Sequence, residues 1–133
     1  MQITKVFGLL LMTTFFLSCS NAQEEIRTQE NSSDVQVTLV DKTAFKKLME
    51  KEGAQLVDVR TPGEIANGKI DEAIEMNFQD TDFKKQLATL NKEEPVLVYC
   101  ASGGRSARAV QVLLDLGFTE IHELKGGYNA WIR

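Results

Sequence analysis

The stretch Pro95-Val96-Leu97-Val98-Tyr99-Cys100-Ala101-Ser102-Gly103-Gly104-Arg105-Ser106 joins a short apolar run to a cysteine, two glycines and an arginine. Residues 96–99 are β-branched, apolar or aromatic, which predicts a buried strand with Cys100 at its carboxyl end. Gly103 and Gly104 allow the backbone to turn its N–H groups inward, and such a nest at the start of a helix favours negative charge. We therefore expect Cys100 to have a lowered pKa and to be nucleophilic at neutral pH.

Arg105 follows this nest and is the expected cation beside Cys100, or the clamp for an anionic substrate. A cation is not favoured by the dipole at the amino end of a helix, so its position indicates a functional role.

Strands and helices alternate on both sides of the cysteine. We expect strands at residues 35–39, 56–59, 73–76, 96–100 and 121–124, with helices between them near residues 43–49, 83–90 and 104–116. This alternation predicts right-handed crossovers and an α/β fold in three layers, with a mostly parallel five-stranded sheet flanked by helices. Ligands bind such sheets beyond the carboxyl ends of the strands, which is where Cys100 is placed independently.

Periodicity and turn residues predict how individual side chains pack. We expect Val35, Val37 and Leu39 to form the buried face of the first strand, and Ala107, Val110 and Leu114 that of the helix after the cysteine. Thr61-Pro62-Gly63 is expected to turn the chain, with Arg60 paired to Asp58 or to Glu64. His122, the single histidine, is expected at the surface or a sheet edge, Tyr128 and Trp131 in the core, and Lys46, Lys47 and Lys51 on a solvated helix face.

The whole chain of 133 residues is 43% hydrophobic and 26% charged, but its amino-terminal end differs in composition from the rest. Residues 1–18 place Lys5 before an apolar stretch of signal-peptide length. Ser18-Cys19 resembles the lipobox of bacterial lipoproteins, so Cys19 is expected to be lipidated; ordinary cleavage after Ala22 is the alternative. Residues 19–34 are polar and predict a flexible tether, and residues 35–133 form the one expected domain.

This organisation predicts an exported protein, lipid-anchored in the cell envelope, with a soluble periplasmic protein as the alternative. Acylation of Cys19 would leave Cys100 as the only thiol, which excludes a Cys-x-x-Cys mechanism. Removal of residues 1–18 leaves 14 basic side chains against 19 acidic ones, a net charge of −5. An acidic domain is not suited to nucleic acid.

Three segments together resemble the rhodanese family of sulfurtransferases. They are Leu56-Val57-Asp58-Val59-Arg60, Val98-Tyr99-Cys100-Ala101-Ser102-Gly103-Gly104-Arg105-Ser106 and Leu124-Lys125-Gly126-Gly127-Tyr128-Asn129-Ala130-Trp131. Their order and spacing cover nearly all of residues 35–133. One segment departs from the pattern: the family often has Gly-His-Ile-Pro-Gly-Ala where this chain has Gly68-Lys69-Ile70-Asp71-Glu72-Ala73, which brings the usual conformation of that loop into question.

The resemblance implies that Cys100 takes a sulfane sulfur from a donor such as thiosulfate, holds it as a persulfide and passes it to a thiophilic acceptor such as a thiol, cyanide or an envelope protein. It implies no metal and no organic cofactor. Residues 101–106 would form the active-site loop and bind substrate, namely Ala101, Ser102, Gly103, Gly104, Arg105 and Ser106. Asp58 and Arg60 would support the neighbouring loops.

Two other function classes stay open. Cysteine phosphatases and arsenate reductases also use a thiolate, a backbone cradle and an arginine. Their phosphatase loops place five residues between the cysteine and the arginine, whereas Cys100 and Arg105 enclose four, a tighter ring suited to a sulfur atom. The second alternative is a non-catalytic or carrier module that presents its surface to an envelope partner, and the altered Lys69–Glu72 segment leaves room for it.

Overall fold

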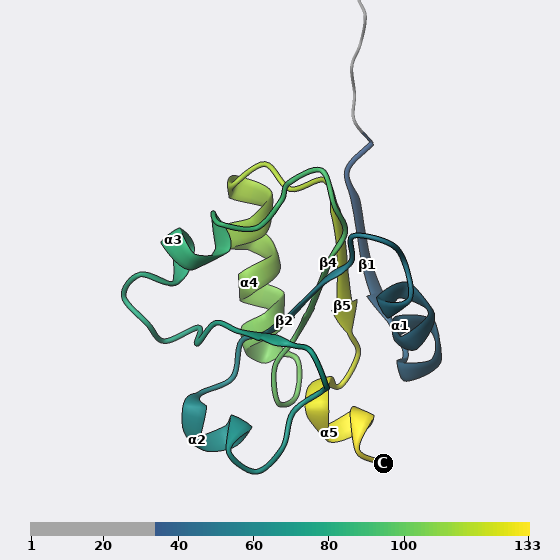
Figure 1. The fold of residues 1–133 in the computed structure, drawn as a ribbon, viewed down its shortest axis with the longest axis vertical. Coiled ribbons are helices and arrows are strands. Elements are labelled where there is room, and N and C mark those ends of the chain that lie inside the picture. Colours follow the sequence, from purple (N-terminus) through teal and green to yellow (C-terminus); the bar gives the residue numbers. More distant parts are fainter. Residues whose placement is uncertain (1–33) are drawn as a thin grey trace, which may run out of the picture. The chain divides into compact units, whose positions relative to one another are not determined.

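The computed structural model describes residues 34–133, which form a five-stranded sheet between helices (Figure 1). In chain order the strands are β1 Gln36–Val40, β2 Gln55–Asp58, β3 Ile74–Glu75, β4 Val96–Tyr99 and β5 Glu120–Leu124. Across the sheet they lie in the order β1-β5-β4-β2-β3, and each neighbouring pair is parallel. The predicted α/β fold with its parallel five-stranded sheet is confirmed.

Helices cover both faces of this sheet. Within the described residues they are α1 Lys42–Met49, α2 Pro62–Ile65, α3 Phe83–Leu87, α4 Gly104–Asp115 and α5 Gly127–Trp131. Figure 1 shows α3 and α4 on one side of the sheet and α1 on the other. Each side has its own buried cluster: Val98 and Leu113 belong to the first, and Phe45 and Leu97, with Trp131 packed against them, belong to the second. The result is the expected three-layer arrangement.

Strand β4 lies in the middle of the sheet, and every one of its side chains is apolar or aromatic. Val96 and Val98 lie in the cluster beneath α3 and α4, whereas Leu97 and Tyr99 lie in the opposite one. Because a central parallel strand is buried on both faces, its sequence is a continuous apolar run. Cys100 continues the alternation and belongs to the cluster on the α4 side, so β4 determines the face of the sheet on which the thiol lies.

The first strand packs differently from the prediction. Val35, Val37 and Leu39 are 58%, 44% and 61% exposed, so the expected buried face is the exposed one. The reason is position: β1 is an edge strand beside β5, and its less exposed side chains, Thr38 and Val40, are those on the other face, which α1 covers. Period-2 alternation identified the strand but did not determine which face is covered.

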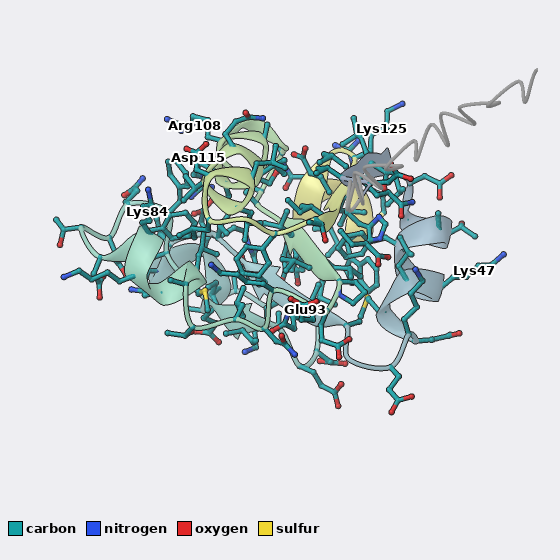
Figure 2. The ribbon with its side chains drawn as sticks, turned by 90° about the horizontal axis from the view of Figure 1, so that it is seen from above. Lys47, Lys84, Glu93, Arg108, Asp115 and Lys125 are labelled. Carbon is teal, nitrogen blue, oxygen red and sulfur yellow. The ribbon has the colours of Figure 1, made fainter. Side chains whose placement is uncertain are left out.

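The buried face of α4 is also rotated from the predicted one. Its buried residues are Ser106, Ala109, Val110 and Leu113, whereas Ala107 is exposed and Leu114 is only partly buried. Arg108 and Asp115 are exposed on the outer side of the helix (Figure 2). The loop after Cys100 fixes where α4 begins, and therefore which of its residues face the sheet. As a result, the Ser106 hydroxyl points inward, toward the cysteine.

The exposed lysines of α1 agree with the prediction, because Lys46, Lys47 and Lys51 are all exposed and Lys47 points away from the body of the protein (Figure 2). The predicted signal peptide 1–18, Cys19 and nearly all of the predicted tether lie outside the described residues. Between residues 34 and 133, no helix combines the length and the apolar character that a membrane crossing needs.

Candidate active site

Cys100 lies directly after β4, where the chain leaves the sheet and turns into α4. Gly103 makes this turn in the left-handed region, with φ 114°, and its N–H donates to Cys100 Sγ at 3.0 Å. Ser102 and Gly104 are exposed, but Cys100 itself is only 1% exposed. The loop therefore folds around the sulfur as a small cradle of backbone donors.

The pKa of Cys100 lies below that of an ordinary thiol. Burial by itself raises this pKa, but hydrogen bonds from the Ser106 hydroxyl and from the backbone N–H groups of Ser106, Gly103 and Ser102 outweigh burial. These donors stabilise the thiolate and have little to stabilise in the neutral thiol. The direction agrees with the expectation drawn from the glycine-rich loop.

The Ser106 hydroxyl is shared among three acceptors. Its oxygen lies 2.6 Å from Glu123 Oε1, 3.0 Å from the Gly103 carbonyl and 3.5 Å from Cys100 Sγ. A hydroxyl has one proton to donate, and a short bond to a carboxylate is the strongest of the three. Glu123 therefore competes with Cys100 for the same hydrogen bond, a role that no motif in the sequence indicated.

Arg105 is not free in the structure. Its Nη1 and Nη2 donate to Glu64 Oε2 and Oε1 at 2.7 and 2.6 Å, a two-pronged ion pair in which the arginine side chain is 18% exposed and the glutamate 35%. The hydrogen bonds to Glu64 raise the pKa of Arg105, and the Cys100 thiolate adds to this by charge. The cation predicted to receive an anionic substrate is thus held by a carboxylate of the protein itself.

Glu64 is held by its own helix as well. Thr61 is the N-cap of α2: the Thr61 N–H and hydroxyl donate to Glu64 Oε2 at 2.9 and 2.8 Å, and the Glu64 N–H donates back to the hydroxyl. The hydrogen bond from Arg105, together with those from Thr61, lowers the pKa of Glu64 to about 2. Residues 61–63, expected as a simple turn, therefore begin a one-turn helix with a capping box.

Arg60 pairs with Asp58 and not with Glu64. Arg60 Nη2 lies 2.6 Å from Asp58 Oδ2, and Arg60 Nε lies 3.0 Å from Oδ1, with both side chains almost fully buried. Burial lowers the pKa of Arg60, but the contacts with Asp58 outweigh it and the net shift is upward. Two buried charges of this kind are stable only together, because removal of one leaves the other without a partner.

The guanidinium of Arg60 also joins three segments of the chain. Its Nη2 donates to the Gly68 carbonyl at 2.9 Å, and its Cζ lies 3.9 Å from the centroid of the Tyr128 ring. Tyr128 itself stacks near Tyr99 of β4, with ring centroids 6.2 Å apart. The buried Arg60–Asp58 pair therefore connects β2, the segment after α2 and α5. These contacts hold the three segments together, as expected for supporting residues.

The segment that departs from the family pattern keeps a tight conformation. Glu72 adopts φ 64°, in the left-handed region, at the place where the family often has its second glycine. The Ile70 N–H donates to the Tyr99 hydroxyl at 3.1 Å, and Lys69 Nζ reaches both the Ala73 carbonyl and Glu75. Glu72 thus carries a backbone conformation that glycine adopts more easily.

The carboxyl-terminal glycines lie at contacts between α5 and the loop after Cys100. The Tyr128 N–H donates to the Cys100 carbonyl at 2.7 Å, and the Asn129 N–H donates to the Ala101 carbonyl at 3.0 Å. Gly127 is buried with φ 58°, and a Cβ there would lie 2.7 Å from the Ala101 carbonyl carbon. Glycine at 127 therefore lets helix α5 approach the loop backbone, a role the sequence analysis did not assign.

His122 lies in a different place from the predicted one. It is 2% exposed in β5, the second strand of the sheet, where its ring nitrogens lie 2.6 Å from Thr38 Oγ1 and 3.0 Å from Glu120 Oε1. The prediction of a surface or edge residue is wrong because β1 adds outside β5 and covers it. Among residues 34–133, no group of three or more His, Cys, Asp or Glu side chains is arranged to hold a metal ion.

Comparison with known proteins places this geometry in a family. The model of the rhodanese-like domain matches residues 41–133. A sulfurtransferase of Allochromatium vinosum is 35% identical over 88 residues, covering 66% of this chain and 80% of that protein. The thiosulfate sulfurtransferase GlpE of Shewanella oneidensis is 31% identical over 84 residues, covering 63% of this chain and 81% of that protein.

A solved structure agrees with the sequence match. The crystal structure of a rhodanese-like domain protein from Staphylococcus aureus superposes with a TM-score of 0.61 at 33% identity, covering 71% of this chain and 90% of that one. The chain belongs to the rhodanese-like domain family, whose sulfurtransferase members are among its relatives.

Proposed function

We propose that the protein is a sulfurtransferase that carries a sulfane sulfur on Cys100 as a persulfide. The observation that carries the proposal is the cradle around Sγ, in which the Gly103 N–H lies 3.0 Å from the sulfur and the pKa of the thiol is lowered although the residue is buried. A thiolate is the form of cysteine that attacks sulfur, and backbone donors preset around it also stabilise a persulfide anion.

The reaction runs in two balanced steps. With thiosulfate as donor, the Cys100 thiolate attacks the outer sulfur, a bond from Sγ to that sulfur forms, and the sulfur–sulfur bond of the donor breaks with its electron pair leaving on sulfite. An acceptor nucleophile such as a thiolate or cyanide then attacks the terminal sulfur. The new bond forms to the acceptor, and Cys100 leaves as a thiolate that the same N–H groups stabilise.

Intact-mass spectrometry tests this proposal on the full chain. After incubation with thiosulfate and other sulfane donors, we expect the protein to gain one sulfur atom that cyanide removes. Cys100→Ser should lose the adduct, whereas Cys19→Ser, which changes the chain's second cysteine, should keep it. If no donor adds sulfur to the wild-type protein, the transfer function is wrong and the fold acts as a non-catalytic module.

A further inference from the structure

The carboxylate of Glu64 occupies the face of Arg105 that a donor oxyanion would use. An arginine fork binds carboxylates and oxyanions through two parallel N–H donors, and here both Nη1 and Nη2 are engaged at 2.7 and 2.6 Å. A sulfonate group arriving at the loop must therefore compete with an anion that is already bound within the same molecule.

Displacement of this internal anion is costly because Glu64 is held at its other side too. Its Oε2 accepts from the Thr61 N–H and the Thr61 hydroxyl in addition to Arg105. Its pKa of about 2 keeps it ionised throughout the physiological range. A movement of the Glu64 carboxylate away from Arg105 would therefore also disturb the capping box of α2.

Each of the two arginines described at the loop is paired with a carboxylate of the protein. Arg105 is balanced by Glu64, and Arg60 is balanced by Asp58. Glu123 adds a further carboxylate through its hydrogen bond to Ser106, and the reacting thiolate adds another negative charge. Thiosulfate, with two negative charges, is repelled by these carboxylates and by the thiolate more strongly than a donor with a single negative charge is.

We propose that Glu64 is a specificity-determining residue that masks Arg105, so that this site takes sulfane donors with at most one negative charge in preference to thiosulfate. The inference rests on the proposed sulfur transfer and deepens it by naming the class of donor. Methanethiosulfonate is the matched probe, because it replaces one charged oxygen of thiosulfate by a methyl group and keeps the sulfane sulfur on the same kind of sulfur centre.

Both probes react by the same balanced step. The Cys100 thiolate attacks the sulfane sulfur, the bond between the two donor sulfurs breaks, and the electron pair leaves on sulfite from thiosulfate or on methanesulfinate from methanethiosulfonate. The two donors therefore differ in charge at the Arg105 end and not in the sulfur that is transferred. A difference in apparent affinity between them reports on the loop electrostatics.

The test measures persulfide formation in single turnovers of the full chain, which separates the apparent Kd of each donor from the maximal rate. In Glu64→Gln the guanidinium loses its internal anion, and we expect the apparent Kd of thiosulfate to fall about tenfold, equivalent to about 1.4 kcal/mol. The apparent Kd of methanethiosulfonate should fall by a smaller factor. The maximal rate with either donor should change little, because the sulfur cradle is untouched.

Glu75→Gln is the matched control, since it removes the same charge from a carboxylate that pairs with Lys69. It should leave the ratio of the two Kd values unchanged. If Glu64→Gln does not fold, Thr61→Val loosens the carboxylate without touching Arg105 and should lower the thiosulfate Kd in the same direction by less. Equal changes for both donors, or none, would overturn the inference. Wild-type protein that accepts sulfur from neither donor would instead refute the transfer function itself.

Discussion

At the scale of single residues, the pKa of Cys100 depends on which acceptor receives the proton of the Ser106 hydroxyl. Ser106 lies near both Cys100 Sγ and Glu123 Oε1, and the carboxylate is the closer acceptor by 0.9 Å, at 2.6 against 3.5 Å. An ionised acceptor at short distance holds the proton, so Glu123 limits how far Ser106 can stabilise the thiolate. The pKa of Cys100 is lowered all the same, because the Ser106 hydroxyl and the backbone N–H groups of Ser106, Gly103 and Ser102 together outweigh burial.

Glu123→Gln should therefore lower the pKa of Cys100 further. The amide is a weaker acceptor and carries no charge, so the Ser106 hydroxyl becomes available to the sulfur and a repulsive carboxylate disappears. Below the titration midpoint, we expect iodoacetamide to alkylate Cys100 about fivefold faster, the worth of one hydrogen bond of about 1 kcal/mol. The rate is lost as pH falls through the pKa of Cys100, so the whole profile should move to lower pH.

Glu120→Gln is the control for this experiment. It lies on the same strand and changes the same charge, but its carboxylate contacts Lys51 and His122. It should leave the alkylation profile where it is. A profile that stays in place in Glu123→Gln, or moves to higher pH, would show that Glu123 does not compete for the Ser106 proton.

At the scale of elements, the segment between α2 and β3 is held by residues that differ from those of the family pattern. Lys69 connects it to the Ala73 carbonyl and to Glu75, the Ile70 N–H is accepted by the Tyr99 hydroxyl, and Glu72 makes the left-handed turn. The sequence alone left the conformation of this segment open, and the structure shows the turn formed with a residue that carries a Cβ in the left-handed conformation.

Glu72→Gly should stabilise the fold. A left-handed conformation costs a residue with a Cβ about 1–2 kcal/mol, and glycine removes this cost. The extra freedom of glycine in the unfolded chain cancels about half of the resulting stabilisation. We expect the free energy of unfolding in urea to rise by about 0.5–1 kcal/mol. Glu72→Ala, which removes the side chain but keeps the Cβ, should show no comparable gain; equal effects of the two changes would mean that strain at this position is not the cause.

At the scale of the whole molecule, the site is assembled from segments far apart in the chain. Glu64 of α2 reaches Arg105 of α4, Glu123 of β5 reaches Ser106, and the amino end of α5 donates to the carbonyls of Cys100 and Ala101. The parallel sheet makes this assembly possible, because the carboxyl ends of β2, β4 and β5 lie side by side.

Gly127→Ala tests the contact between the carboxyl-terminal helix and the active-site loop. The new Cβ would overlap the backbone of Ala101, so we expect a loss of more than about 2 kcal/mol in the free energy of unfolding, since strain and overpacking add. The pKa of Cys100 should rise toward that of a free thiol as the cradle is displaced. Thermal unfolding and the alkylation profile measure the two effects.

Gly126→Ala is a close control, because Gly126 also has a positive φ but an added Cβ would meet only the Ala130 side chain, at 3.0 Å. Backbone strain alone should lower its free energy of unfolding, and the pKa of Cys100 should stay unchanged. If both variants change that pKa equally, the effect comes from a distorted α5 in general and not from contact with the loop.

Much of this arrangement could be predicted from local patterns. The apolar run 96–99 predicted β4, the alternation of elements predicted the parallel sheet, and the Gly103-Gly104 pair predicted a cradle of N–H groups at Cys100. Each of these depends on backbone propensities and burial that neighbouring residues determine. One further local signal was present but unused: Thr61 and Glu64 have the spacing of a capping box, which predicts where that glutamate is held.

What the chain determines locally, then, is the set of elements, the position of Cys100 at the end of β4 and the loop that lowers its pKa. Only the tertiary structure decided which distant groups meet: Glu64 pairs with Arg105, Glu123 competes for the Ser106 hydroxyl, and β1 covers His122. The physical reason is that electrostatic and hydrogen-bond partners are selected by distance in space. Glu64 and Arg105 are 41 residues apart along the chain, and Ser106 and Glu123 are 17 apart, so no local pattern records these partners.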